Sequence, residues 1–147
     1  KDNFLSLSKK LSEVGAKLIL KALTAFEQKK IIYEDQNEKL VTYAQKIDKR
    51  ESAIDWNKPA KKLIAKINGL NPYPGVWFKH NETRIKIIEA EISENNGKNG
   101  EVLTDDLVIG CQDKAIKIKL LQKEGKSVLN SKSFLAGYKI VKGDLLS

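Results

Sequence analysis

Residues suited to acid–base or metal chemistry are scarce in this sequence of 147 residues. Its single histidine, His80, lies among polar residues, with no cysteine or acid at a spacing typical of metal ligands. We therefore predict that His80 is a solvated turn residue and that the chain has no metal site. We expect Asp105-Asp106 to mark a turn rather than a catalytic dyad. The single cysteine, Cys111, is expected to be a small buried residue and suits a reducing compartment.

A phosphate-binding loop is suggested by Gly125-Lys126-Ser127, because glycine, lysine and serine end the P-loop motif. That motif also needs a glycine five positions before its last glycine, and Leu120 stands there in an expected strand. We reject the P-loop and expect a basic hairpin turn. No apolar run approaches the ~20 residues that a membrane span needs.

The main chemical feature of the chain is its excess of basic residues, which gives a formal net charge of +8. Residues 1–32 carry seven bases against three acids (+4), residues 33–55 four against six (−2), and residues 56–147 sixteen against ten (+6). A basic chain attracts nucleic acids through counterion release. The alternative is that the lysines only solvate the surface, and charge by itself does not decide between the two.

The most distinctive stretch runs over residues 54–78. An Ile-Asp-Trp step leads to Pro59, which suits the first turn of a helix, and then to apolar residues at 63, 64, 67 and 70 on one helix face. Asn-Pro-Tyr-Pro-Gly at 71–75 ends the helix and permits a tight turn into Val-Trp-Phe at 76–78. The pattern predicts a helix, a turn and a strand.

This stretch resembles the start of the C-terminal domain of the methionyl-tRNA formyltransferase family, which carries an Ile-Asp-Trp step and an aromatic Asn-Pro-(Trp/Tyr)-Pro-Gly turn. Other motifs resemble the family in the same order along nearly the whole chain. They are Lys-Leu-Ser-Glu-Val-Gly-Ala at 10–16, Thr-Tyr-Ala-Gln-Lys-Ile at 42–47, Leu-Gln-Lys-Glu-Gly-Lys-Ser at 121–127 and Phe-Leu-Ala-Gly at 134–137. Arg50 stands where the family usually has an acid, and Ser127 where it often has a lysine.

The resemblance implies the tRNA-binding C-terminal part of a bacterial, cytoplasmic translation-initiation enzyme. That enzyme transfers a formyl group from 10-formyltetrahydrofolate to the amino group of methionyl initiator tRNA. The family's Asn, His and Asp catalytic site would lie upstream of Lys1, so this chain would hold no catalytic residue and bind no cofactor. A chain that opens on Lys1 rather than Met indicates a truncated N-terminus.

Two alternatives to this function stay open. One is the matching domain of another formyltetrahydrofolate-dependent formyltransferase or hydrolase. The other is a free-standing basic RNA-binding barrel without an enzymatic parent. The Thr-Tyr-Ala element and the Leu-Gln-x-x-Gly-Lys element favour the tRNA enzyme over the first alternative.

The residues expected to contact tRNA are all basic. By resemblance, the linker contributes Lys46, Lys49 and Arg50. Charge adds candidates on the predicted helix and in the late turn: Lys58, Lys61, Lys62, Lys66, Lys123 and Lys126. For each lysine, ordinary solvation is an equal alternative. Four aromatic residues are candidates for stacking on bases, with core packing favoured for each: Trp56, Tyr73, Trp77 and Phe78.

Three parts are expected to position these residues. Residues 1–32 would be the terminal helix of a truncated Rossmann-like formyltransferase domain, capped by Ser6 or Ser8 and ending near Gln28. Residues 33–55 would be a linker with a helical patch at 41–47. Residues 56–147 would be a C-terminal OB-like tRNA-binding domain.

The expected fold class is α+β and mainly β: a small OB-like antiparallel barrel led by a helix, preceded by a detached N-terminal helix and a linker. Apolar residues that alternate by twos suggest strands, and turn residues separate them. The strands are expected at residues 76–79, 84–92, 101–104, 107–111 and 115–122. The barrel agrees with the family's domain.

The N-terminal helix is apolar on more than one face and needs a partner. In the intact enzyme, which we expect to be monomeric, its apolar residues would pack on the catalytic domain. In this chain the helix would fold onto the barrel, pair with a second copy or fray. Pairing is favoured at high concentration, because burying a large aliphatic side chain contributes roughly 1.5–3 kcal/mol. The residues concerned are Leu11, Leu18, Ile19, Leu23 and Phe26.

Overall fold

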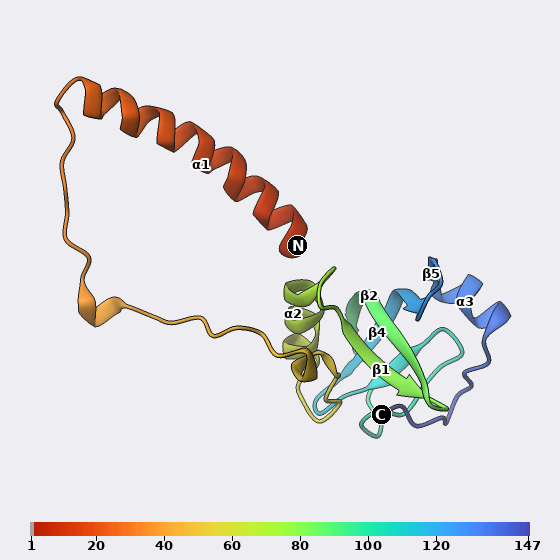
Figure 1. Cartoon of the computed structure of the whole chain (residues 1–147). Coiled ribbons are helices and arrows are strands. Elements are labelled where there is room, and N and C mark those ends of the chain that lie inside the picture. Colours follow the sequence, from red (N-terminus) through yellow and green to blue (C-terminus); the bar gives the residue numbers. More distant parts are fainter. Residues whose placement is uncertain (1) are drawn as a thin grey trace. The chain divides into compact units, whose positions relative to one another are not determined.

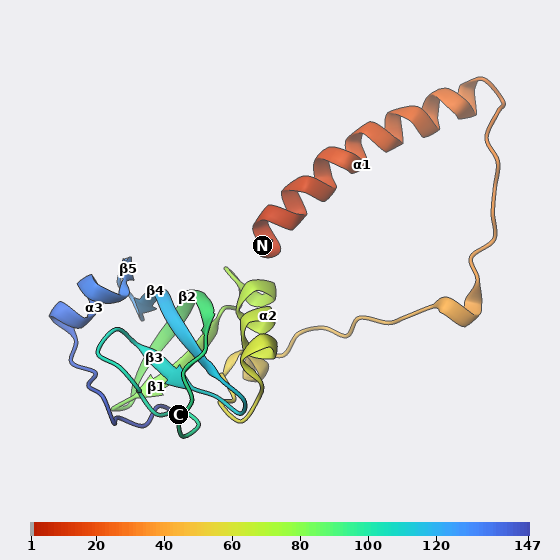
Figure 2. The same cartoon turned by 180° about the vertical axis from the view of Figure 1, so that it is seen from behind.

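The structure is a computed structural model that describes residues 2–147. It contains two units, a smaller one over Leu5–Ile47 and a larger one that contains Asp48–Ser147 (Figure 1). The fold is α+β, with a five-stranded antiparallel sheet in the larger unit, as the sequence predicts. Figure 2 shows the sheet from behind, with α2 (Ala60–Leu70) beside it.

The smaller unit consists of helix α1 (Phe4–Glu27) and an irregular segment. None of the 24 residues described in α1 is buried, so its apolar side chains are exposed within this unit. The helix starts ahead of Ser6 and Ser8, so the prediction that one of them caps it is wrong. Within the described chain, no helix is long and apolar enough to cross a membrane.

The helical patch predicted at residues 41–47 is also wrong. These residues are all described, and they carry no helix. Short 3-10 turns lie on either side instead, η1 (Glu38–Leu40) and η2 (Lys49–Ser52). Each follows a polar residue whose side chain accepts a backbone hydrogen bond, Asn37 before η1 and Asp48 before η2, and such local caps favour a short turn over a longer helix.

Helix α2 begins directly after Pro59 and ends where the Asn-Pro-Tyr-Pro-Gly turn begins. Its buried residues are those of the predicted apolar face, Leu63, Ile64 and Ile67, together with Ala60. The backbone N–H of Ala60 donates a 2.8 Å hydrogen bond to the carboxylate of Asp113. That bond satisfies a donor that the start of a helix leaves without a partner inside the helix.

The sheet has the strand order β1-β2-β4-β3, with β5 also paired to β4. Every pairing between the named strands is antiparallel. Strand β2 carries register irregularities between Ile87 and Ala90, which bend a strand and increase its twist. The strands are β1 (Val76–His80), β2 (Thr83–Ser93), β3 (Val108–Gly110), β4 (Ala115–Lys123) and β5 (Val128–Asn130).

Irregular segments join the outer strands of the sheet into a closed barrel. Val102 bridges Ile109 at the edge of β3, and Glu101 bridges Leu145. The last residue then reaches β1, where the N–H of Ser147 donates a 3.1 Å hydrogen bond to the carbonyl of Lys79. The predicted barrel is therefore present, although residues 101–104 contribute isolated bridges rather than the strand expected there.

The barrel encloses one apolar core. Its fully buried residues include Phe78 of β1, Ile85 and Ile87 of β2, and Leu121 of β4. Cys111 is buried as predicted, and burial raises the pKa of its thiol to about 12, which leaves it protonated at neutral pH. The sequence analysis missed two short elements, β5 and helix α3 (Ser131–Gly137).

His80 is buried, and its prediction as a solvated turn residue is wrong. Its side chain is 6% exposed, with Nε2 3.1 Å from a carboxylate oxygen of Asp144. Its Nδ1 lies 3.2 Å from the hydroxyl oxygen of Tyr138, and that hydroxyl also lies 2.9 Å from the carbonyl of His80. These contacts tie the end of β1 to the last segment of the chain.

Candidate nucleic-acid interface

A pocket of about 300 Å³ on the larger unit brings basic and aromatic side chains together. We call it the basic pocket. Its walls come from η2, the turn after α2, strands β1, β2 and β4, and the turn after β4. The lining residues are Lys49, Ser52, Tyr73, Pro74, Trp77, Arg84, Lys86, Gln122, Lys123, Glu124 and Gly125.

Strand register places the central residues of the basic pocket in one row. Trp77 of β1 stands opposite Lys86 of β2, and Lys86 stands opposite Gln122 of β4. Successive side chains of a strand point to opposite faces, and the neighbours of Trp77 are buried, so this row faces outward. Arg84 lies two residues before Lys86 on the same face, and its guanidinium carbon is 4.1 Å from the centroid of the Trp77 ring.

The turn after α2 brings Tyr73 to the same pocket. Gly75 adopts φ +83°, a conformation that side chains disfavour, and its N–H donates a 2.9 Å hydrogen bond to the carbonyl of Leu70. Tyr73 is 73% exposed, so the expectation that it packs in the core is wrong. Trp77 is half-buried, whereas Trp56 and Phe78 are core residues, 5% and 0% exposed.

The positive charge of the basic pocket is not neutralised within residues 2–147. Four lining residues are basic, Lys49, Arg84, Lys86 and Lys123, and one is acidic, Glu124; the Nζ of Lys123 lies 5.0 Å from the centroid of the Tyr138 ring. None of the four bases belongs to an ion pair in the part of the chain that the structure describes. A concave surface with excess charge of one sign attracts ions of the other sign.

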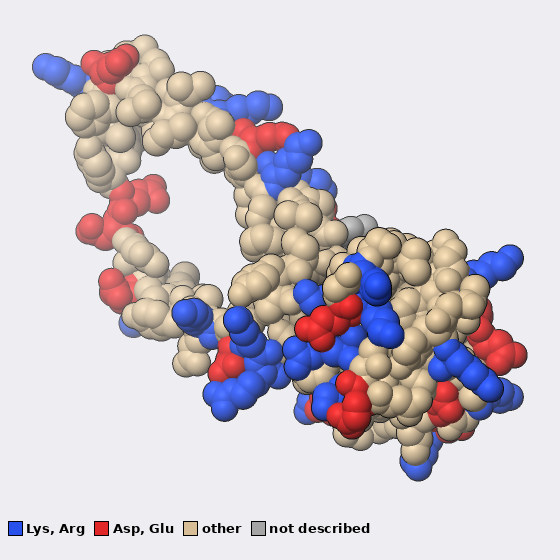
Figure 3. Space-filling view, turned by 45° about the vertical axis from the view of Figure 1, so that its right-hand side comes forward, with Lys and Arg blue, Asp and Glu red and all other residues tan. Residues whose placement is uncertain are grey.

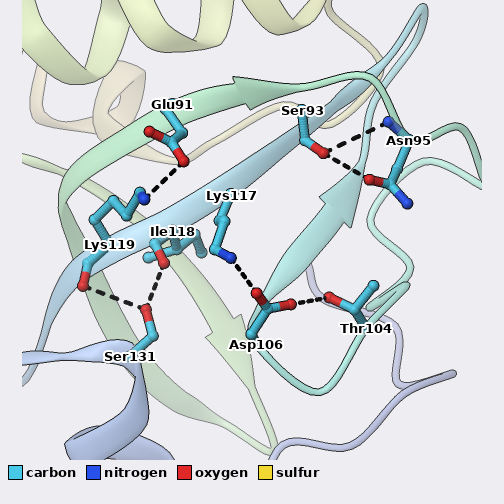
Figure 4. Close-up of polar contacts among 9 residues, drawn as sticks. All are labelled: Glu91, Ser93, Asn95, Thr104, Asp106, Lys117, Ile118, Lys119 and Ser131. Carbon is cyan, nitrogen blue, oxygen red and sulfur yellow. Dashed lines mark hydrogen bonds and ion pairs between the residues drawn. The ribbon is translucent and has the colours of Figure 1, made fainter.

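Several other basic side chains of the larger unit are paired with acids, whereas others outside the pocket, such as Lys61, Lys62 and Lys126, also belong to no ion pair among residues 2–147. On the face drawn in Figure 3, acidic side chains stand among the basic ones. Figure 4 shows two of the pairs, Lys119 with Glu91 at 2.7 Å and Lys117 with Asp106. The hydrogen bond from Lys117, together with one from Thr104, lowers the pKa of the Asp106 carboxyl. We call the face that carries these pairs the ion-paired face.

The basic pocket contains two of the nine predicted RNA-binding residues, Lys49 and Lys123. Arg50 follows Lys49 directly but is engaged by Asp48, whose carboxylate accepts hydrogen bonds of 3.1 Å from Nε and 2.8 Å from Nη2. The Nζ of Lys58 lies 3.5 Å from a carboxylate oxygen of Asp55. Contact with tRNA stays a prediction for each of these residues.

The remaining predicted residues lie outside the pocket. Lys66 is half-buried, donates a 2.7 Å hydrogen bond to the carbonyl of Ala53, and has its pKa lowered by burial. Lys61 and Lys62 are exposed on α2, and Lys126 is exposed in the turn after β4. Lys46 belongs to the smaller unit, where it is exposed.

Sequence reasoning missed Ser52, Arg84, Lys86 and Gln122. The signal for Arg84 and Lys86 was available, because both alternate with the buried Ile85 and Ile87 and so must face outward from the sheet. No local signal indicated Ser52. Its hydroxyl is buried and has no hydrogen-bond partner among residues 2–147, although the residue lines the basic pocket.

Comparison with known proteins gives one matching domain family and several named relatives. Residues 46–139 match the family described as formyl transferase, C-terminal domain. The methionyl-tRNA formyltransferase of Bradyrhizobium diazoefficiens is 40% identical over 141 residues, which cover 93% of this chain and 45% of that protein. That of Pelagibacter ubique is 38% identical over 147 residues, covering 99% and 47%. The chain thus spans about half the length of these curated relatives.

Solved structures with the same fold include HypX from Aquifex aeolicus. A variant of HypX superimposes with a TM-score of 0.71 at 25% identity, covering 97% of this chain and 28% of that one. HypX in complex with tetrahydrofolic acid gives a TM-score of 0.65 at 26% identity, covering 87% and 24%. The first of these likenesses covers nearly the whole of this chain.

Proposed function

This chain belongs to the formyl transferase C-terminal domain family, and we propose that it is the part of a methionyl-tRNA formyltransferase that holds the initiator tRNA. The intact cytoplasmic enzyme would transfer the formyl group of 10-formyltetrahydrofolate to the amino group of methionyl initiator tRNA. Relatives that carry this name are 38–40% identical over nearly the whole chain, whereas HypX is 25–26% identical. This difference favours the tRNA enzyme over other formyltetrahydrofolate-dependent proteins.

We assign the formyl-transfer step to the part of these relatives that this chain does not span. The histidine of this chain is buried against Tyr138 and Asp144, so it is not offered to a substrate. The purified chain is therefore expected to show no formylation of methionyl-tRNA. Measurable formylation by the chain alone would contradict this assignment.

The observation that carries the RNA-binding proposal is the unpaired positive charge of the basic pocket. Lys49, Lys86 and Lys123 have no acidic partner among residues 2–147. RNA phosphates can replace their counterions, and the release of these ions favours binding. A lysine already held by a carboxylate contributes less, because the phosphate must compete with the acid.

The test compares two triple variants with the same change in net charge. One is Lys49→Ala, Lys86→Ala and Lys123→Ala in the basic pocket. The other is Lys114→Ala, Lys117→Ala and Lys119→Ala, which removes lysines paired with Glu94, Asp106 and Glu91. The dissociation constant for methionyl initiator tRNA is measured for both at several salt concentrations.

The pocket triple is expected to weaken binding roughly a hundredfold at about 0.15 M salt, because the loss of three phosphate contacts lowers the salt slope by about 0.9 for each contact. The control triple is expected to weaken binding only a few-fold. Equal losses in the two variants would exclude the pocket as the main contact surface. A wild-type chain without affinity for tRNA would overturn the function itself.

A further inference from the structure

The basic pocket contains two flat side chains that binding of phosphate does not require. Tyr73 projects with 73% of its surface exposed, and Arg84 lies over the Trp77 ring at 4.1 Å. An exposed aromatic ring at the wall of a pocket offers a flat face to a ligand, and a lysine would supply the charge of Arg84 without its plane. The pocket therefore combines positive charge with stacking surfaces.

Stacking surfaces of this kind suit nucleobases. One face of the Arg84 guanidinium covers Trp77, and Arg84 is exposed, so its other face is open to a ligand. Unpaired bases of RNA stack on aromatic rings and on guanidinium planes, whereas paired bases are already stacked inside a helix. These surfaces therefore select for a base that has left its helix.

The size and polarity of the pocket fit a small ligand of this type. Its volume of about 300 Å³ lies at the lower end of the range for small-molecule sites. Lys49 and Lys86 supply charge for a phosphate. The Nε2 of Gln122 donates a 2.6 Å hydrogen bond to the carbonyl of Lys126, so Gln122 offers its amide oxygen as an acceptor for a base edge.

We infer that the basic pocket receives one unpaired nucleotide of the bound tRNA, with the base stacked on Arg84 or Tyr73 and the phosphate held by Lys49 and Lys86. This inference rests on the proposed function, since the nucleotide belongs to the RNA. It adds a preference that charge alone does not create. Unpaired RNA should bind this pocket better than a duplex of the same charge.

The two tryptophans allow a direct test with the whole chain. Trp77 lines the pocket, whereas Trp56 is buried in the core and acts as an internal control. Their indole N–H signals are followed by two-dimensional NMR during titration with three probes. The probes are a single-stranded RNA of about six nucleotides, a blunt RNA hairpin of the same charge whose strands are joined by a non-nucleotide linker so that every base is paired, and AMP.

The expected result is a saturating shift of the Trp77 signal with the single-stranded RNA, a much smaller shift with the hairpin, and no movement of Trp56. Equal shifts with the single strand and the hairpin would overturn the inference. Saturation by AMP at the same concentration as RNA would also overturn it, because the pocket would then serve a free nucleotide.

Two variants separate stacking from charge. Arg84→Lys keeps the charge and removes the plane, and Tyr73→Ala removes the second stacking surface. Each is expected to weaken single-strand binding roughly five- to a hundredfold while leaving hairpin binding and the salt slope almost unchanged. A preference for single strands that survives in the double variant would overturn the inference.

The same measurements distinguish this inference from the proposed function. If tRNA binds with the expected salt dependence and no probe moves the Trp77 signal, the nucleotide site is wrong and the function stands. If tRNA itself does not bind, the proposed function fails, and the nucleotide site fails with it.

Discussion

The two ends of the β2–β4 pair carry similar side chains in opposite electrostatic settings. At one end Lys86 faces the basic pocket and Lys123 lines it, and neither has an acidic partner among residues 2–147; the Nζ of Lys123 lies 5.0 Å from the centroid of the Tyr138 ring. At the other end Lys119 is held by Glu91 at 2.7 Å (Figure 4). The number of lysines on a strand therefore does not locate a binding surface. The acids that neutralise them decide which end attracts a polyanion.

Strand register explains the difference. The neighbours of Lys86 across the sheet are Trp77 and Gln122, and neither is charged. At the opposite end Lys117 stands across from Glu91, so acids and bases meet on adjacent strands. Cross-strand neighbours of opposite charge stabilise a sheet by fractions of a kcal/mol. The ion-paired face contributes to the fold, and the basic pocket keeps its charge available for a ligand.

The largest expected effect comes from a substitution in the core that both ends share. Leu121 is fully buried and stands opposite Ile87 in the register of β2 and β4. Leu121→Ala should lower the free energy of unfolding by roughly 2–5 kcal/mol, because it leaves a cavity. Leu129→Ala is the control, since Leu129 faces Leu121 in the register of β4 and β5 but is 38% exposed. Urea denaturation measures both, and equal losses would show that β5 is part of the core.

A charge reversal should affect a different property at each end, tRNA binding at the basic pocket and stability at the ion-paired face. Lys86→Glu is expected to weaken tRNA binding about tenfold or more, because it removes one contact and adds a repulsion, and to change stability by less than about 0.5 kcal/mol. Lys119→Glu places two acids together with Glu91 and should cost about 0.5–1 kcal/mol of stability, with only a few-fold change in binding. Binding is measured with tRNA, and stability by urea denaturation. Identical profiles for the two variants would remove the distinction between the ends.

The ion-paired face also predicts a pH effect. Hydrogen bonds from Lys117 and Thr104 hold the pKa of Asp106 below its ordinary value of 3.8. A lowered folded-state pKa contributes stability above the unfolded pKa, and this contribution is lost as the pH falls through the folded pKa. Asp106→Asn should therefore reduce stability near pH 7 by at most about 1 kcal/mol and flatten the decline in acid.

The matched control for this pH effect is Asp105→Asn. Asp105 is the adjacent exposed residue, and it forms no ion pair in the described part of the chain. Urea midpoints at a series of pH values from 7 to about 3 compare the three proteins. A wild-type curve that runs parallel to that of Asp106→Asn below pH 4 would show that Asp106 does not stabilise the fold.

Local patterns in the sequence predicted much of the fold. Alternation of Ile85 and Ile87 with polar residues predicted strand β2, and the apolar face of residues 63–70 predicted α2. The two missed elements, β5 and α3, have three and seven residues, which is too short for a periodic signal.

Contacts between segments far apart in the chain could not be predicted from the sequence. His80 meets Tyr138 and Asp144, which lie 58 and 64 residues away. The basic pocket likewise joins η2 to strands that follow later in the chain, so Lys49 could be named as a candidate but not assigned to one pocket with Lys86. Alternation within a strand shows that a lysine faces outward, but it does not show whether an acid stands next to it.

The smallest expected effect concerns two adjacent residues of η2. Lys49 lines the basic pocket, whereas Arg50 is held by two side-chain hydrogen bonds from its guanidinium to Asp48. These bonds lower the pKa of Asp48 and raise that of Arg50. Asp48→Asn would release Arg50 and remove one negative charge beside the pocket, and asparagine can still cap η2.

We therefore expect Asp48→Asn to strengthen tRNA binding by about two- to threefold at low salt, since one additional cation becomes available to phosphates. Arg50→Ala in the wild-type background should change the affinity by less than about twofold. In the Asp48→Asn background, the same substitution should abolish the gain. This double-mutant cycle isolates the Asp48–Arg50 coupling. An affinity that does not respond to Asp48→Asn would show that pairing with an acid does not limit RNA binding at this turn. The contrast between the basic pocket and the ion-paired face would then rest on the position of the lysines rather than on neutralisation of their charge.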